Sequence, residues 1–282
     1  MKLTIEATNI CPLPCHDSDK NRLLRERGVM DTNTFKSIME RCKNLDIQEI
    51  KFGGSGEALL NPDITDFINH INLISSKIKS FLVTNGTLLS PKIAESFAKA
   101  NLKNIEVILS PPHVPLTTTL RGSAKGRIYE NITLVAKIFQ NIKIVHALPQ
   151  WSDEQRQIVS QFWRIRGISK VFFGSRLACG VVIKKHETPL GLRPPTCALF
   201  RGEHYITWNG KLISCCHDRS GETEIGDLDI ESPASLIEKK KRITDRQFFY
   251  PICYECDDDR RYGSKGGIQK VVRQAINILT SS

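Results

Sequence analysis

The sequence predicts an α/β fold in which helices cover a parallel sheet, and three observations support this prediction. Short apolar runs alternate with segments of helical periodicity up to about residue 180. Strands that are separated by helix-length segments pair in parallel. The chain of 282 residues with 40% hydrophobic residues can also bury a sizeable core. We therefore expect one large domain, open or curled into a barrel, with or without a small appendage.

The expected strands are short apolar runs at residues 3–7, 47–52, 80–83, 105–109, 142–147 and 171–173. The stretches between them are expected to form helices, because their apolar residues recur at helical spacing. Two examples are the sets Phe35, Ile38, Met39, Cys42 and Phe67, Ile68, Ile71, Ile74.

The pattern changes at residues 187–195, a proline-rich stretch that we interpret as a linker. After it, residues 205–208 and 211–214 flank Asn209-Gly210, a strong signal for a β-hairpin. Ser232 is expected to cap a helix, and the chain ends in an amphipathic helix. The predicted domains are a core over 1–186, a small cysteine-rich α+β appendage over 187–260 and the final helix over 261–282.

Composition limits the class of protein. No segment has the eighteen or so uncharged apolar residues of a membrane span, and residues 1–5 show no signal-peptide pattern. We expect a cytoplasmic protein whose nine cysteines stay reduced, which favours metal ligation over disulfides. The net charge of +10 is diffuse, with clusters at 20–27 and 239–242, and no aromatic platform accompanies it. A nucleic-acid partner is therefore disfavoured.

Unusual residues follow the first four expected strands, at the end where a parallel α/β sheet binds its ligand. They are Thr8-Asn9-Ile10-Cys11, Gly53-Gly54-Ser55-Gly56-Glu57, Thr84-Asn85-Gly86 and Ser110-Pro111-Pro112-His113.

The first of these segments leads into Cys11-x3-Cys15-x2-Ser18, which resembles the Cys-x3-Cys-x2-Cys loop of radical S-adenosylmethionine (SAM) enzymes. Ser18 stands where that family has its third cysteine, and the flanking segments 6–9 and 27–31 resemble the family as well. The resemblance implies a partial (β/α)6 TIM-like barrel. It also implies that Cys11, Cys15 and Ser18 mark the site of a [4Fe-4S] cluster, which binds SAM and supports its cleavage to a 5′-deoxyadenosyl radical.

The glycine loop resembles the SAM-binding motif of the same family. This implies that Gly53, Gly54, Gly56 and Glu57 seat SAM, since glycines let the main chain approach a ligand and a carboxylate offsets an ammonium group. The resemblance extends to Asn85 in the third-strand turn and to Ser110 as a ribose contact. The alternative is a tight βα turn in which Glu57 caps a helix.

The tail carries a second cysteine set. Its spacing resembles the SPASM and twitch appendages of radical SAM proteins, in which four cysteines hold an auxiliary [4Fe-4S] cluster; the matching residues are Cys197, Cys215, Cys253 and Cys256. Four thiolates can equally hold zinc, so a zinc site is the alternative. Cys42, Cys179 and Cys216 are interpreted as small buried residues, with a substrate-side role as the alternative for Cys179, which follows the sixth expected strand.

Ser18 leaves three explanations open, because a hydroxyl binds iron far less readily than a thiolate does. An oxygen or nitrogen ligand from Ser18 or a neighbour completes the cluster, the chain is a non-catalytic member of the family, or the serine is an engineered substitution.

The resemblance thus implies a radical SAM oxidoreductase that oxidises or crosslinks a small molecule or peptide. The auxiliary cluster would accept an electron, and flavodoxin or ferredoxin would supply reducing equivalents. The sequence identifies no catalytic side chain beyond the cofactor-binding residues. The alternative is a catalytically degenerate binding protein that keeps this fold and only the C-terminal metal site.

Overall fold

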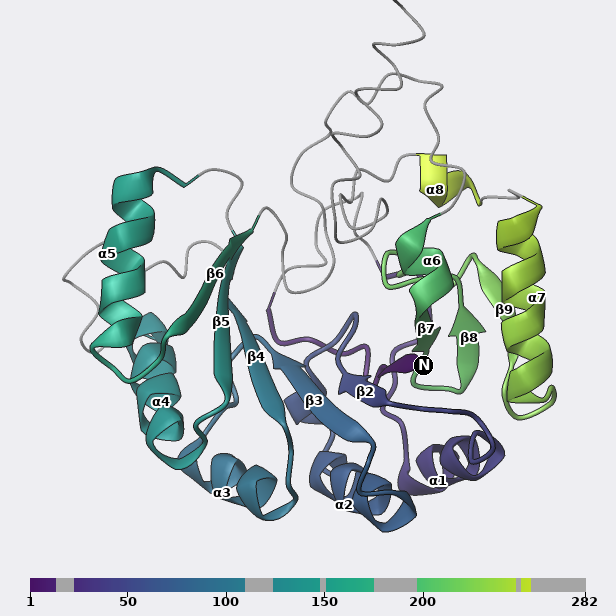
Figure 1. The fold of residues 1–282 in the computed structure, drawn as a ribbon, viewed down its shortest axis with the longest axis horizontal. Coiled ribbons are helices and arrows are strands. Elements are labelled where there is room, and N and C mark those ends of the chain that lie inside the picture. The colour runs from purple at the N-terminus through teal and green to yellow at the C-terminus, as the bar shows by residue number, and fades with distance from the viewer. Residues whose placement is uncertain (14–22, 110–123, 148–150, 175–196, 247–249, 255–282) are drawn as a thin grey trace, which may run out of the picture.

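A computed structural model describes residues 1–13, 23–109, 124–147, 151–174, 197–246 and 250–254 of the chain (Figure 1). The strands are β1 (Lys2–Ile5), β2 (Glu49–Phe52), β3 (Lys79–Thr84), β4 (Asn104–Leu109), β5 (Ile142–Ala147), β6 (Lys170–Gly174), β7 (Glu203–Ile206), β8 (Lys211–Ile213) and β9 (Glu224–Asp227). The helices are α1 (Thr32–Arg41), the 3-10 helix η1 (Ala58–Leu60), α2 (Ile64–Ile74), α3 (Pro91–Lys99), α4 (Ala124–Ile138), α5 (Asp153–Arg164), α6 (Ala198–Gly202), α7 (Pro233–Asp245) and α8 (Pro251–Tyr254).

The strands form one nine-stranded sheet in the order β6-β5-β4-β3-β2-β1-β7-β8-β9. The first six strands are parallel to their neighbours, as the sequence predicts for an α/β fold. All six expected strands are present, with bounds that differ by at most two residues at either end. Strands β6 and β9 are the two ends of this order, so the described sheet does not close by pairing. Curvature into a partial barrel remains a prediction.

The two faces of the sheet differ in burial. In β4, Ile105, Val107 and Leu109 are buried, whereas the alternating Glu106 lies on the other face and pairs with Lys143 of β5 at 2.7 Å. Figure 1 shows α1 to α5 following the outer side of the strand array. The helices therefore cover one face, and the opposite face keeps partly exposed polar residues.

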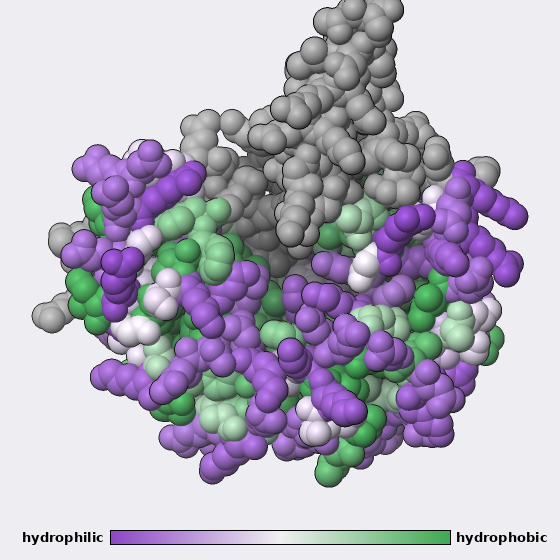
Figure 2. Space-filling view, in the orientation of Figure 1, coloured by the Kyte–Doolittle hydropathy of each residue, from purple (hydrophilic) through white to green (hydrophobic). Residues whose placement is uncertain are grey.

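The outer surface is mostly hydrophilic. Figure 2 shows hydrophilic side chains over most of the visible face, with smaller hydrophobic areas between them. None of the helices in the described ranges has the length and apolar character that crossing a membrane requires.

The predicted hairpin and helix cap of the tail are both present. Strands β7 and β8 pair antiparallel around Asn209-Gly210, and Gly210 has a φ of 79°, which glycine adopts without strain. Helix α7 begins where expected, since the Ser232 side chain accepts a hydrogen bond from the Ser235 backbone N–H.

The tail hairpin extends the main sheet. Strand β7 pairs in parallel with β1, with Lys2 opposite Glu203 and Ile5 opposite Ile206. Sequence pattern alone predicted an appendage over 187–260, and its hairpin occupies the edge of β1 that β2 leaves open. The predicted boundary at 186/187 and the predicted helix over 261–282 lie outside the described residues.

The carboxylate of Glu6 fixes this junction. Glu6 directly follows β1 and is fully buried. Both of its oxygens accept hydrogen bonds from the Arg25 guanidinium, each at 2.8 Å, and one accepts from the Tyr205 hydroxyl at 2.9 Å. The backbone N–H groups of Ser55 and Trp208 also donate to it, each at 3.3 Å. One side chain thereby joins β1, the loop after β2 and the β7–β8 hairpin.

The contacts with Glu6 shift the pKa values of Arg25 and Tyr205. Burial lowers the pKa of Arg25, but the hydrogen bond and the charge of Glu6 outweigh that effect and raise it overall. Burial, together with the Glu6 charge, raises the pKa of Tyr205 well above its ordinary value. The two shifts favour a charged Arg25 guanidinium and a neutral Tyr205 phenol.

Replacing Glu6 should therefore destabilise the fold strongly. We expect Glu6→Ala to lower the free energy of unfolding by about 3–5 kcal/mol, because it leaves the Arg25 guanidinium buried without its carboxylate. Urea denaturation followed by circular dichroism measures this difference. The control is Glu49→Ala, which removes a surface ion pair with Lys2 at 2.8 Å and should cost at most about 1 kcal/mol. Equal losses in the two variants would contradict the role given to Glu6.

Candidate functional site

The loops after β1, β2 and β3 meet at the carboxyl end of the sheet. The Glu57 backbone N–H donates to the Ile10 carbonyl at 2.8 Å, which joins the loops after β1 and β2. The Asn85 side chain, after β3, donates from Nδ2 to Cys11 Sγ at 3.7 Å. The structure thus brings Cys11, the glycine loop and Asn85 together. The other predicted residues of this site, Cys15, Ser18 and Ser110, lie outside the described residues.

Two glycines of the loop allow unusually close approach of protein groups. A Cβ atom on Gly56 would lie 2.3 Å from the Thr8 carbonyl oxygen and 2.7 Å from that of Ile10. Gly54 has a φ of 134°, and a Cβ atom there would lie 1.9 Å from the Tyr205 hydroxyl oxygen. Any side chain at either position would push the loop away from β1 or from the tail hairpin.

The Glu57 carboxylate faces protein donors. It accepts hydrogen bonds from Thr84 Oγ1 and from the Asn85 backbone N–H, both at 2.7 Å, and from the Leu59 backbone N–H at 3.2 Å. Burial raises its pKa, and these hydrogen bonds oppose that effect. These are the contacts of the turn-and-cap alternative, in which Glu57 caps η1 and ties the loop to the end of β3. A contact between Glu57 and SAM stays a prediction.

The segments 6–9 and 27–31, which flank the cysteine loop and both resemble the radical SAM family, are hydrogen-bonded to each other. Thr8 Oγ1 donates to the Gly28 carbonyl at 2.7 Å, and the Gly28 backbone N–H donates to Asn9 Oδ1 at 2.9 Å. Asn9 Nδ2 also donates to the Glu26 carbonyl at 2.7 Å. The stem of the cysteine loop is therefore held against the segment that leads into α1.

The described tail cysteines belong to different elements. Cys197 occupies the N-cap position of α6, Cys215 follows β8 and is buried, and Cys253 lies in α8. Cys256 lies outside the described residues. Within the described ranges, no group of three or more His, Cys, Asp or Glu side chains is placed to hold a metal ion, and no cysteine is joined in a disulfide. The four-cysteine centre therefore stays a prediction.

Three residues that connect these regions were not identified from the sequence as site residues. Arg25 and Tyr205 hold the Glu6 carboxylate, and Lys240 is buried although it belongs to the basic cluster 239–242. For Lys240 a signal exists, since it follows the buried Leu236 by one helical turn. No local pattern marks Arg25 or Tyr205.

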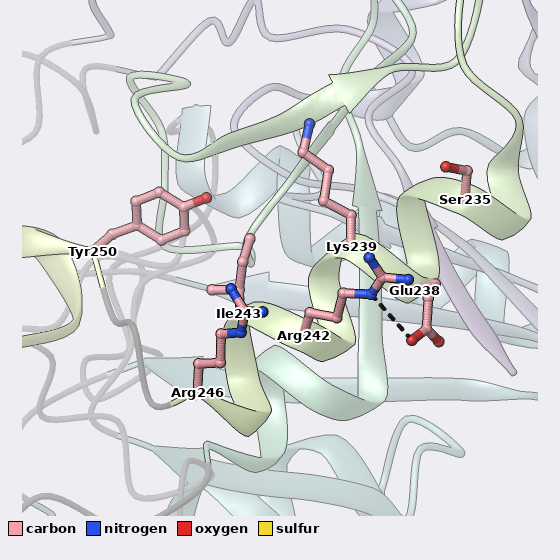
Figure 3. A pocket seen from close by; sticks show the side chains of 7 residues that line it. All are labelled: Ser235, Glu238, Lys239, Arg242, Ile243, Arg246 and Tyr250. Carbon is pink, nitrogen blue, oxygen red and sulfur yellow. Dashed lines mark hydrogen bonds and ion pairs between the residues drawn. The ribbon is translucent and has the colours of Figure 1, made fainter.

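A separate groove of 750 Å³ is lined by side chains of α7 and by Tyr250 (Figure 3). Its cations are Lys239, Arg242 and Arg246, and Arg242 lies 3.4 Å from the Glu238 carboxylate. Ile243 and Tyr250 complete an amphipathic lining. The cations outnumber the single carboxylate, so the groove presents net positive charge.

Comparison with known proteins identifies the family. The Radical SAM superfamily model matches residues 5–162, which is more than half of the chain. The chain is 31% identical over 111 residues to PqqA peptide cyclase of Gluconobacter oxydans, covering 38% of this chain and 29% of that protein. It is 24% identical over 146 residues to mycofactocin maturase MftC of Mycobacterium tuberculosis, covering 50% of this chain and 36% of that protein. The matched segments thus span about a third of these relatives.

The fold of a solved structure agrees with this match. The structure of native anSMEcpe with bound AdoMet superimposes with a TM-score of 0.65 at 14% identity, covering 99% of this chain and 98% of that one. At this identity the likeness concerns the fold alone. The family model, together with the α/β fold and the meeting of the loops after β1, β2 and β3, shows that this chain belongs to the radical SAM superfamily.

Proposed function

We propose that this protein is a radical SAM oxidoreductase that acts on a peptide. The observation that carries the proposal is the meeting of Cys11, the glycine loop and Asn85 at the carboxyl ends of neighbouring strands. The peptide substrate is inferred from relatives whose names refer to peptides or their maturation, such as PqqA peptide cyclase. Oxidation and crosslinking are both compatible with this proposal.

The donor chemistry at the strand ends fits an iron–sulfur cluster. Cys11 presents a soft sulfur donor there, and the N–H···S hydrogen bond from Asn85 would stabilise it as a thiolate. When bound, a [4Fe-4S] cluster supplies the electron for reductive cleavage of SAM to a 5′-deoxyadenosyl radical. Cys15 and the residue at position 18 would each hold one further iron, which leaves the fourth iron open to bind SAM.

The chain's own residues would then position SAM. Gly54 and Gly56 let the loop pack directly against Tyr205 and the Thr8 carbonyl, and this packing would hold the backbone groups of the loop in place to bind the methionyl part of SAM. Glu57, held by Thr84 and Asn85, fixes the loop at the end of β3. Asn85 would thus connect the cluster ligand Cys11 to the loop that seats SAM. The half-buried polar face of the sheet, with Glu106 and Lys143, would face the substrate side.

The tail is proposed to hold an auxiliary cluster of the twitch or SPASM kind through Cys197, Cys215, Cys253 and Cys256, with zinc as the alternative. The electron from the substrate radical would leave through this cluster, and flavodoxin or ferredoxin would reduce the first one. The competing proposal is a binding protein of the same fold that has lost radical generation. Ser18 favours it, because a hydroxyl is a poor ligand for iron.

The glycine loop provides one test. We expect Gly56→Ala, made in the chain that carries Ser18→Cys, to weaken SAM binding at least about tenfold, because its Cβ would lie 2.3 Å from the Thr8 carbonyl oxygen and displace the loop. Equilibrium dialysis of the reconstituted protein with labelled SAM measures this. Gly202→Ala is the control, since a Cβ there meets nothing within 4 Å. Unchanged SAM binding in Gly56→Ala would count against the loop as the SAM seat.

Ser18 provides a second test. After anaerobic reconstitution with SAM and a strong reductant, the Ser18→Cys variant should form much more 5′-deoxyadenosine than the chain as given, because it restores a third thiolate ligand. Chromatographic quantification of 5′-deoxyadenosine gives the readout. Equal, substantial turnover by both proteins would show that another ligand suffices. No product from either would favour the binding-protein proposal.

The identity of the tail metal provides a third test. After anaerobic purification, a chain with Cys11→Ser and Cys15→Ser should retain iron and sulfide, because the tail thiolates are unaffected. A further Cys253→Ser change should abolish that iron, as elemental analysis would report. If the chain with Cys11→Ser and Cys15→Ser contains zinc and no iron, the tail holds a zinc site and the proposal of an auxiliary cluster is wrong.

A further inference from the structure

The groove lined by α7 and Tyr250, which we name the α7 groove, carries a row of cations. Lys239, Arg242 and Arg246 follow one another at intervals of three and four residues, which places them on one face of the helix. At a rise of about 1.5 Å per residue they span roughly 10 Å along the helix axis. The α7 groove therefore presents positive charge along about two helical turns.

These cations have weak partners within the protein. Arg242 lies 3.4 Å from the Glu238 carboxylate, and Lys239 lies 3.9 Å from that of Glu231. The side chains of Arg242 and Lys239 are 70% and 52% exposed, and ion pairs this exposed contribute little stability. Among the described residues, none forms an ion pair with Arg246. Carboxylates of another chain can therefore bind these cations at little cost.

The apolar part of the α7 groove is held in place by the tail. The Tyr250 ring stacks on the buried Phe200 of α6, with ring centroids 6.3 Å apart and planes 19° from parallel. Ile243 and Tyr250 are both partly buried and pack against the hydrophobic core. Figure 3 shows Tyr250 on the opposite side of the groove from the α7 side chains. The volume of 750 Å³ is within the range of about 300–1,000 Å³ that is usual for ligand pockets.

We propose that the α7 groove binds an acidic segment of the peptide substrate, in which carboxylates flank an aliphatic or aromatic side chain. The inference rests on the peptide substrate of the proposed function. It adds a contact region made of residues other than Cys11, the glycine loop and Asn85.

The chemistry of the groove matches such a segment. The apolar side chain packs against Ile243 and Tyr250, and the carboxylates pair with the cations of α7. A row of roughly 10 Å corresponds to about three residues of an extended peptide. Carboxylates on either side of one apolar residue therefore reach both ends of the row.

Two other occupants match the groove less well. Binding of a nucleic acid without sequence preference uses aromatic rings on which bases stack, and the Tyr250 ring is already stacked on Phe200. The chain's own residues 255–282 include four acidic and five basic side chains, so this segment brings no net negative charge. Charge complementarity therefore favours an acidic peptide.

Binding of a synthetic peptide tests the proposal without SAM cleavage. The probe is fluorescein-labelled Gly-Ser-Glu-Leu-Glu-Phe-Glu-Ser-Gly, titrated with the full chain while fluorescence anisotropy is recorded. We expect it to bind at least about tenfold more tightly than the same peptide with lysine in place of each glutamate. The variant with Arg242→Glu and Arg246→Glu should lose at least about tenfold in affinity for the acidic peptide, because like charges then face each other. Added salt should weaken the binding to the parent chain.

The matched control is the variant with Lys92→Glu and Lys99→Glu on α3. Both lysines are exposed, and the net charge changes by the same amount as in the variant with Arg242→Glu and Arg246→Glu. The control should bind the acidic peptide as the parent chain does. Equal affinity in the two double variants would overturn the proposal, because the attraction would then reflect only the overall charge of the protein.

Tyr250→Ala tests the apolar contact. It should weaken binding of the acidic peptide, and circular dichroism shows whether the variant remains folded. A folded Tyr250→Ala chain that binds as tightly as the parent would overturn the apolar part of the proposal.

The other occupants are outcomes of the same titration. If the parent chain binds the peptide only after Asp257→Asn, Asp258→Asn and Asp259→Asn, the chain's own acidic run occupies the groove and the proposal is wrong. Tighter binding of labelled oligothymidylate than of the acidic peptide, lost in the variant with Arg242→Glu and Arg246→Glu, would assign the groove to nucleic acid instead.

Failure of this proposal is distinguishable from failure of the proposed function. The absence of peptide binding would count against the α7 groove alone, since formation of 5′-deoxyadenosine by the Ser18→Cys chain does not depend on it. The absence of 5′-deoxyadenosine would count against the radical chemistry and leave the measured peptide affinity as it is.

Discussion

The arrangement of this protein depends on a single buried carboxylate. Glu6 accepts hydrogen bonds from Arg25, Tyr205 and two backbone N–H groups, and these donors come from segments far apart in the sequence. A buried carboxylate is stable only when such donors surround it. The glycine loop and the tail hairpin must therefore take up their positions together, because both supply donors to the same group. The proposed SAM seat and the cysteine-rich tail are linked through Glu6.

Much of the fold was predictable from the sequence, because periodicity reports which residues face the core. The six parallel strands, the hairpin at Asn209-Gly210 and the cap at Ser232 all follow from local patterns. The pairing of β7 with β1 was not predictable in this way. The partners are remote in the sequence, and nothing in either segment identifies the other. The same limitation explains why Arg25 and Tyr205 were not recognised as partners of Glu6.

The candidate site was predictable to a similar extent. The order of motifs after the strands identified Cys11, the glycine loop and Asn85, and these residues do meet. The direction of a side chain was harder to predict. The sequence left open whether Glu57 binds SAM or caps the turn; its carboxylate accepts hydrogen bonds from Thr84 and Asn85, and a contact with SAM stays a prediction. Lys240 belongs to a run of basic residues that resembles a solvated surface, yet the helical period turns it inward. The sequence shows that a charged residue is present, but which groups surround that residue depends on how the chain packs.

The parallel pairing of β7 with β1 also affects how the protein must be made. Tyr205 and Glu6 are 199 positions apart in the chain, so at a synthesis rate of about 5–20 residues per second the earlier strand waits on the order of 10–40 seconds for its neighbour. During that interval one edge of β1 exposes unpaired backbone groups, and Glu6 has no Tyr205 to bind. Exposed strand edges promote association with other chains. During synthesis, the free edge of β1 can therefore pair with other chains. That stage ends when β7 has been synthesised and pairs with β1.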